Sequence, residues 1–208
     1  MEDVLEVYAE PYDPRRPKVN CDETSKQLIK ETRPPLPAQP GRPPRGDYEY
    51  ERHGPRKLFL FVEPQAGWRR VPVTERRTAL DFAYEMQWLL DEGYPAAEVI
   101  RVIWDNLNTH KIASLYEAFT PAEARRIARK LELHYTPKHG SWLNMAEIEF
   151  SVLHQPCLDR RIPDEATLTR EIAAWAQQRT REKAIIDWRF SVTDARQKLE
   201  RLYPSLPS

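Results

Sequence analysis

The chain has 208 residues, a length that suits one domain of ordinary to large size with a substantial hydrophobic core. Its 32 basic and 32 acidic residues cancel, so no overall positive field attracts nucleic acid, and a protein that only binds DNA is disfavoured. The first residues, MEDVLEVYAEP, lack the apolar segment of a secretion signal, and no apolar run approaches the roughly 20 residues that a membrane span needs. We therefore expect a cytoplasmic protein that has no membrane partner.

The amino-terminal third is predicted to contain a helix, a strand, a loop and a hairpin. Residues 1–17 indicate a short helix with a proline-punctuated lead-in, and residues 19–22 indicate a short strand. The run PPLPAQPGRPP excludes a helix or a central strand, because proline fixes φ and has no amide donor. A surface loop rich in proline and arginine is therefore expected at about residues 33–56. The segments KLFLFVE and WRRVPV, on either side of the turn PQAG, predict an antiparallel hairpin.

Helices and strands alternate in the rest of the chain. Residues 78–92 place apolar side chains at a spacing of three to four, which predicts an amphipathic helix that ends at Gly93. Residues 99–104 form a nearly unbroken apolar run, as in a central strand that is buried on both faces. Thr120 and Pro121 predict the cap and the first residue of a helix. Further helices are expected at 111–119, 121–131, 141–154, 164–179 and 193–202, with a strand that contains Leu133 and Tyr135.

Three acids stand where a metal site for phosphodiester chemistry would need them. Asp22 ends the short first strand, Asp105 ends the apolar strand, and Glu147 lies on the helix expected at residues 141–154. The order of elements sets the two strands side by side in the centre of an α/β fold. Carboxylates at strand ends and on a packed helix are the oxygen ligands that divalent metals such as Mg2+ prefer. The sequence therefore predicts a metal site at these three acids.

The residues alone leave other interpretations of these acids open. Asp22 also fits a solvated strand end or a cap for the residues that follow it. Glu149 competes with Glu147: the two side chains point about 200° apart on a helix, so they cannot share a face. The apolar residues around them do not decide which of the two faces the other acids.

Six short strings, in the same order along the chain, carry a resemblance to a known family: CDETSKQL, DYEYER, GWRRVPVTERRTA, DNLNTH, YTPKHGSWLNMAE and CLDRRIPD. Together they resemble the catalytic domain of bacterial insertion-sequence transposases of the mariner superfamily, also called DDE superfamily endonucleases. The resemblance runs from about Val4 to Pro204 and covers nearly the whole chain. It favours Glu147 over Glu149, because the family motif places its acid directly after N-x-A.

The resemblance implies a single catalytic domain with a ribonuclease-H-like fold, in which helices flank a central mixed sheet. It implies an enzyme that cleaves DNA strands at transposon ends and transfers the freed 3′ ends into target DNA, with no covalent protein–DNA intermediate. Two Mg2+ (or Mn2+) ions held by Asp22, Asp105 and Glu147 would be the cofactors. Transposon-end and target DNA are the expected partners, and the relatives imply a homodimer or higher oligomer.

Further polar residues are candidates for supporting roles. Site-supporting roles are expected for Asn106, Asn108 and His110, although an N-x-N-x-H run also fits a turn and a helix cap. DNA-binding roles are expected for Arg42 and Arg45 in the proline-rich loop, and for Lys138, His139, Ser141 and Trp142 before the helix of Glu147. All of these also fit solvated loops, with Trp142 packed.

Two departures from the family pattern bear on activity. Lys18 and Asn20 stand where relatives carry an apolar strand, so we expect the first strand to be shortened, or displaced in register by one residue. Relatives also begin with helix-turn-helix segments that recognise the transposon end, whereas this sequence starts close to the catalytic domain. We therefore expect a truncated copy or one half of a split reading frame. The alternative functions are an inactive transposase remnant that acts as a DNA-bound or dimerising scaffold, and a general ribonuclease-H-like nuclease.

Overall fold

The computed structural model describes residues 1–43, 45–105, 111–138 and 140–203. The predicted site-supporting residues Asn106, Asn108 and His110, and the predicted DNA-binding residue His139, lie outside the described residues. Within the described ranges, no helix is long and apolar enough to cross a membrane.

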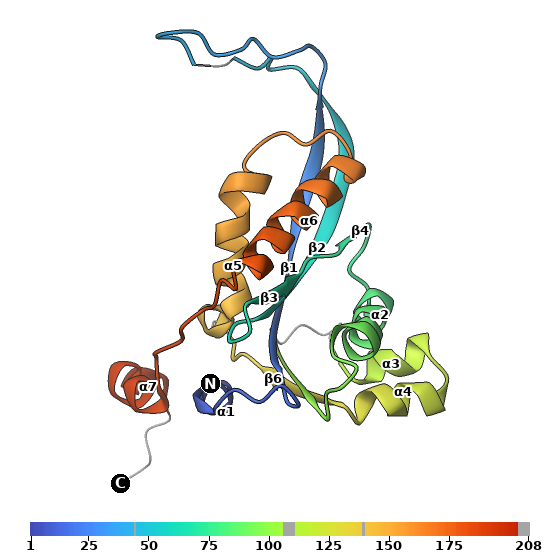
Figure 1. The fold of residues 1–208 in the computed structure, drawn as a ribbon, viewed down its shortest axis with the longest axis vertical. Helices are drawn as coiled ribbons and strands as arrows, with labels where there is room; N and C mark the ends of the chain where they lie inside the picture. Colours follow the sequence, from blue (N-terminus) through green and yellow to red (C-terminus); the bar gives the residue numbers. More distant parts are fainter. Residues whose placement is uncertain (44, 106–110, 139, 204–208) are drawn as a thin grey trace.

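A mixed β-sheet forms the centre of the fold (Figure 1). Its strands are β1 (Lys18–Glu31), β2 (Tyr50–Glu63), β3 (Trp68–Arg70), β4 (Val73–Thr74), β5 (Ile100–Trp104) and β6 (Leu131–Tyr135). The strand order is β3-β2-β1-β5-β6, and β4 pairs with β2. β2 runs antiparallel to β1, whereas β5 runs parallel to both β1 and β6. β1, which carries Asp22, and β5, which leads to Asp105, are therefore neighbours, as predicted.

Helices cover both faces of this sheet (Figure 1). They are α1 (Glu2–Ala9), α2 (Ala79–Trp88), α3 (Ala113–Ala118), α4 (Pro121–Ala128), α5 (Met145–Leu153), α6 (Glu165–Arg181) and α7 (Val192–Lys198). Turns of 3-10 or π helix lie at Leu89–Gly93, Ser141–Leu143, His154–Leu158 and Glu200–Leu202. α2, α3 and α4 pack on one face and α5 and α6 on the other, while α1 and α7 lie together near the amino-terminal end of β1. The predicted α/β class, a mixed sheet flanked by helices, is confirmed.

Alternate side chains of β1 face two different cores. Val19 and Cys21 are fully buried in the core beneath α2, where Trp104 of β5 packs edge-on against three phenylalanine rings. Because side chains alternate along a strand, Asn20 and Asp22 point to the opposite face, on which α5 and α6 pack. The fold thus turns the first acid toward the helix that carries the third.

β1 and β2 are longer than the sequence predicts. Each runs for 14 residues, so the expected strand at residues 19–22 is too short, and residues 50–56 of the expected loop belong to β2. Pairing of β1 with β2 continues as far as Glu31, opposite Tyr50. The outer residues of these strands are mostly polar, and they lie beyond the core, so no alternation of apolar residues marks them in the sequence.

The expected shortening of the first strand at Lys18 and Asn20 is wrong. Both residues are buried, at 5% and 0% exposure, and both pair in register with β5. Hydrogen bonds offset the cost of burying their polar groups. Lys18 donates to the carbonyl of Glu10, and the side-chain oxygen of Asn20 accepts from the amide of Met145. β1 therefore keeps its register up to Asp22.

The outer half of β1 and β2 projects from the sheet as a two-stranded ribbon (Figure 1). The register of the pair shifts between Gln27 and Ile29, and Pro55 lies opposite Gln27. The ribbon leads into the proline-rich loop, where Arg45 bridges to Leu36. This ribbon carries the loop well away from the body of the protein.

Candidate metal-binding active site

The first two acids lie on neighbouring parallel strands. Asp22 belongs to β1, and Asp105 follows the last residue of β5. Asn20 pairs with Ile103, and continuing this register by two residues brings Asp105 level with Asp22. Adjacent strands are about 4.8 Å apart, so the two acids lie close together where β5 ends against the middle of β1. Both residues are partly exposed, which leaves them accessible to a ligand.

The third acid, Glu147, lies in the first turn of α5. Asn144 caps this helix, because its Oδ1 accepts a 3.1 Å hydrogen bond from the amide of Ala146. The Nδ2 of Asn144 donates a 2.7 Å hydrogen bond to the carbonyl of Cys21, the residue before Asp22. The start of the helix that carries Glu147 is thus bonded directly to the strand that carries Asp22.

The ionisation of Asp22 reflects this grouping. Burial raises the pKa of Asp22 to about 7, and the nearby charges of Glu147 and Asp105 contribute to the rise. A 2.7 Å hydrogen bond from the amide of Glu23 to Oδ1 of Asp22 acts in the opposite direction and is outweighed. The negative charges of Glu147 and Asp105 make ionisation of Asp22 less favourable, so the three acids create a strongly negative field. Such a field attracts a divalent cation.

The chemistry of these donors fits a hard divalent cation such as Mg2+ or Mn2+. All three groups are carboxylates, which supply the oxygen ligands that these ions prefer. Within the part of the chain that the structure describes, no three acidic, histidine or cysteine side chains converge on one point. Asp22 nevertheless lies close enough to Asp105 and Glu147 for their charges to raise its pKa.

Glu149, the competitor of Glu147, is engaged in a buried ion network. Its side chain is fully buried and accepts two hydrogen bonds of 2.7 Å from Arg69 and two, of 3.1 and 2.8 Å, from Arg179. Burial alone would raise the pKa of Glu149, but the two guanidinium groups hold it below its usual value. Because both carboxylate oxygens are bonded to arginines from β3 and α6, Glu149 anchors α5 to its neighbours. This arrangement supports Glu147 as the third member of the site.

Three predicted DNA-binding residues, Lys138, Ser141 and Trp142, come shortly before α5 in the chain. Lys138 and Ser141 are exposed. Trp142 is 40% exposed; it stacks on Trp188 at a centroid distance of 6.4 Å and meets Phe190 edge-on at 5.3 Å. Trp142 is therefore held by its neighbours while part of its surface faces solvent, a few residues before Glu147.

Arg42 and Arg45 are not brought to the acids. Both are exposed in the loop at the end of the ribbon. The nine residue steps from Asp22 to Glu31 span about 30 Å along the strand, at about 3.3 Å per step. The loop therefore lies at the opposite end of the ribbon from the site (Figure 1).

Sequence reasoning did not identify Asn144 or the ion network of Glu149. Asparagine is a preferred helix cap, but Asn144 lies inside the helix expected at residues 141–154, whereas α5 begins at Met145 with Asn144 as its cap. No sequence signal links Arg69 and Arg179 to Glu149, since these residues lie 80 and 30 positions away in the sequence. Their meeting depends on the packing of β3 and α6 around α5.

A protein family and several solved structures are similar to this chain. A family model described as DDE superfamily endonuclease matches residues 18–169, a segment that contains Asp22, Asp105 and Glu147. No curated protein matches the chain. Among solved structures, the crystal structure of the Mos1 strand transfer complex is similar at 11% sequence identity with a TM-score of 0.57, covering 87% of this chain and 55% of the Mos1 chain. The chain thus spans just over half the length of the Mos1 chain.

Two viral proteins are similar at lower scores. The simian T-cell lymphotropic virus intasome matches at 12% identity with a TM-score of 0.46, over 78% of this chain and 50% of the other. The catalytic core domain of BIV integrase matches at 13% identity with a TM-score of 0.34, over 88% and 94%. The assignment of a ribonuclease-H-like fold rests on the Mos1 similarity. With the family match over most of its length, the chain belongs to the DDE superfamily endonucleases.

Proposed function

We propose that this chain is the catalytic domain of a transposase, which cleaves DNA at transposon ends and joins the freed 3′ ends to target DNA. The proposal rests on the grouping of Asp22, Asp105 and Glu147 where β1, β5 and α5 meet, with the pKa of Asp22 raised by burial and by the other two acids. Membership of the DDE superfamily endonucleases supports nuclease chemistry at this site.

The three acids would hold two divalent cations, Mg2+ or Mn2+. When bound, such ions stabilise the charge that develops on the attacking and leaving oxygens of a phosphodiester. The main chain of β1 and the end of β5 fix Asp22 and Asp105, and the cap of Asn144 fixes the turn that carries Glu147. Acids that are held in place need little reorganisation as the reaction proceeds, and this favours the rate.

The DNA would contact the protein in two regions. Near the acids, Lys138 neutralises a phosphate, and Ser141 and the exposed part of Trp142 contact the strand that is cleaved. At the end of the ribbon, Arg42 and Arg45 contact phosphates of the duplex farther along its axis. Because the charges of the chain balance, these local groups supply the affinity for DNA. Two transposon ends would be held by two or more copies of the protein.

Metal-dependent nicking of a supercoiled plasmid tests the proposal. The parent chain is compared with Asp105→Asn and Glu147→Gln, which remove one charge each with little change in shape. Glu92→Gln is the matched control, because Glu92 is exposed and lies in the turn before β5, at the other end of that strand. We expect nicking with Mg2+ or Mn2+ by the parent and by Glu92→Gln, and none by the two site variants.

The other outcomes distinguish the alternatives. Cutting of RNA in RNA–DNA hybrids, with DNA duplexes left intact, would indicate a general ribonuclease-H-like nuclease. A folded parent chain that binds DNA and no Mn2+, and that leaves plasmid intact, would indicate an inactive remnant. Joining of a labelled 3′ end to target DNA by the parent would establish strand transfer as well as cleavage.

A further inference from the structure

We propose that Tyr8 of α1 is a positioning residue for the active site, one that sets the placement of Glu147 relative to Asp22. This inference rests on the proposed function, because it assigns a role in the same metal site. It concerns a residue outside the segment 18–169 that the family model matches. The argument depends on a hydrogen-bonded group formed by Tyr8, Asn20 and the start of α5.

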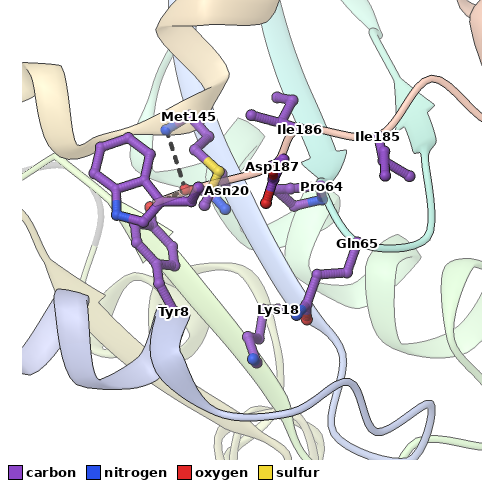
Figure 2. A pocket seen from close by; sticks show the side chains of 10 residues that line it. Tyr8, Lys18, Asn20, Pro64, Gln65, Met145, Ile185, Ile186 and Asp187 are labelled. Carbon is purple, nitrogen blue, oxygen red and sulfur yellow. Dashed lines mark hydrogen bonds between the residues drawn. The ribbon is translucent and has the colours of Figure 1, made fainter. Parts of the chain in front are cut away.

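The side chain of Asn20 joins β1 to α5, and Figure 2 shows this contact. Its Oδ1 accepts a 3.2 Å hydrogen bond from the amide of Met145, the first residue of α5. This contact fixes the orientation of the Asn20 amide, because the reverse orientation would set two donors against each other. Asn20 is fully buried, so losing the acceptor would leave the amide of Met145 without its bond in a dry environment.

The hydroxyl of Tyr8 joins the same two elements. It faces Oδ1 of Asn20 (Figure 2) and also donates, at 2.8 Å, to the carbonyl of Leu143 in the turn before α5. One hydroxyl proton is shared between these two acceptors, so moving either Asn20 or Leu143 changes the hydrogen bond to the other. Tyr8 therefore reaches both the strand of Asp22 and the chain that enters the helix of Glu147.

The positions of these contacts explain how they would act on the metal site. Asn20 and Asp22 are two residues apart on the same face of β1, a separation of about 7 Å. Met145 is two residues before Glu147 in the first turn of α5. A shift of this turn would carry the carboxylate of Glu147 with it. Misplacement of a reacting group by about 1 Å can lower a rate by roughly a hundredfold. Loss of the hydrogen bonds that hold the start of α5 is therefore expected to slow the reaction.

The ring of Tyr8 is held firmly enough to transmit this constraint. It lies 5.2 Å from the ring of Trp188, which in turn stacks on Trp142. Its helix is anchored by Val4 and Leu5, which are buried in the cluster that includes Leu143.

The Nδ2 of Asn20, which has no hydrogen-bond partner among the described residues, borders a cavity of about 190 Å³ that Tyr8 also lines (Figure 2). Such a cavity is large enough for water.

Tyr8→Phe tests the proposal, with Tyr94→Phe as a matched control. Both tyrosines are partly buried, both rings lie 5.2 Å from a tryptophan ring, and each hydroxyl makes a 2.8 Å hydrogen bond. The hydroxyl of Tyr94 donates to Glu63 in β2, and its ring packs on the core beneath α2, on the other face of the sheet from α5. Each variant removes a single oxygen atom, so both are expected to fold and to lose similar thermal stability.

Three readouts separate positioning from a loss of stability. We expect kcat for nicking to fall on the order of tenfold in Tyr8→Phe with KM unchanged, and to remain at the parent value in Tyr94→Phe. Amide hydrogen exchange across residues 141–150 should accelerate in Tyr8→Phe alone. The affinity for Mn2+, measured by titration calorimetry, should weaken in Tyr8→Phe alone.

The outcomes distinguish this inference from the proposed function. If the parent nicks DNA and the two variants match in kcat, Mn2+ affinity and exchange, the positioning role is overturned and the proposed function stands. If the parent binds Mn2+ without nicking, weaker Mn2+ binding by Tyr8→Phe with faster exchange supports the role, and equal binding overturns it. If the parent neither nicks nor binds Mn2+, the proposed function fails and the positioning role fails with it.

Discussion

The side-chain amide of Asn144 lies 2.7 Å from the carbonyl oxygen of Cys21 and bonds the cap of α5 to the strand of Asp22. Asn144 is 2% exposed, and its oxygen also accepts the amide of Ala146. One side chain thus satisfies a helix terminus and a strand carbonyl at once. The geometry of the candidate site depends on this residue as well as on the acids themselves.

Replacement of Asn144 should therefore affect both stability and nicking. We expect Asn144→Ala to lower the free energy of unfolding by about 1–3 kcal/mol, because a cap and a buried acceptor lose their partner. Urea unfolding measures this change, and plasmid nicking measures the effect on the site. Thr78→Ala is the control, since Thr78 caps α2 on the other face of the sheet. Equal nicking by the two variants would argue against a role for Asn144 in the site.

Glu147 and Glu149 should respond differently to the same substitution. Glu147→Gln should abolish nicking with the free energy of unfolding changed little, because Glu147 is partly exposed. Glu149→Gln should destabilise the fold by about 3–5 kcal/mol, since it leaves two arginines in a buried network without their counter-charge. Chemical denaturation and nicking per folded molecule measure the two effects. Loss of nicking in a fully folded Glu149→Gln, with Glu147→Gln active, would reverse the assignment.

The raised pKa of Asp22 predicts a stability that depends on pH and on metal. Its pKa is about 7 in the folded state and about 3.9 in an unfolded chain, so the folded state binds the proton more tightly. The contribution to stability is fully present below about pH 4 and is lost as pH rises through about 7. Its size is at most about 4 kcal/mol, because Asp22 is partly exposed.

Urea unfolding at pH 5.5 and pH 8 tests this dependence. The parent should lose more stability than Asp22→Asn between these two values, since the asparagine has no proton to release. Added Mg2+ should restore stability to the parent at pH 8 by binding the folded state, with a smaller effect on Asp22→Asn. Identical pH profiles for the two proteins would show that Asp22 does not titrate in this range.

The arginines at the end of the ribbon should affect DNA binding without affecting the chemistry. Each phosphate contact contributes about 0.9 to the slope of log affinity against log salt, so Arg42→Gln with Arg45→Gln should reduce the slope by about 1.8. Fluorescence anisotropy with a duplex of 30 base pairs or so, long enough to reach the loop, measures this slope. Arg125→Gln with Arg129→Gln gives the same change in net charge elsewhere, since Arg125 is exposed in α4 and Arg129 is exposed directly after it. Equal slopes for the two double variants would place the DNA away from the ribbon.

The sequence was most informative where burial imposes a periodic pattern. The apolar run at residues 99–104 predicted β5, observed at Ile100–Trp104, because a strand covered on both faces must be apolar throughout. The cap at Thr120 correctly marked the start of α4. These elements placed Asp105 at the end of a central strand. Periodicity alone could not choose between Glu147 and Glu149, because the partners of Glu149 come from β3 and α6.

The sequence was least informative where polar residues are buried. Lys18 and Asn20 argued against a regular strand, yet both are buried in β1, because Glu10 and Met145 supply the missing hydrogen-bond partners. Glu10 directly follows α1, and Met145 begins α5, far from Asn20 in the sequence. Burial of a polar side chain is decided by its tertiary neighbours, and local residue patterns do not record them.

The ribbon of β1 and β2 also bears on aggregation. A long two-stranded ribbon exposes main-chain groups on which strands of other molecules could assemble. Three features oppose this. Pro55 has no N–H to donate to another strand. The amide of Ile29 already donates to the carbonyl of Ile162 at 2.7 Å, and the ammonium group of Lys26 donates to the carbonyl of Leu158. The shifted register beside Gln27 twists the ribbon as well. The protein can therefore extend a long arm into solvent while resisting edge-to-edge assembly into fibres.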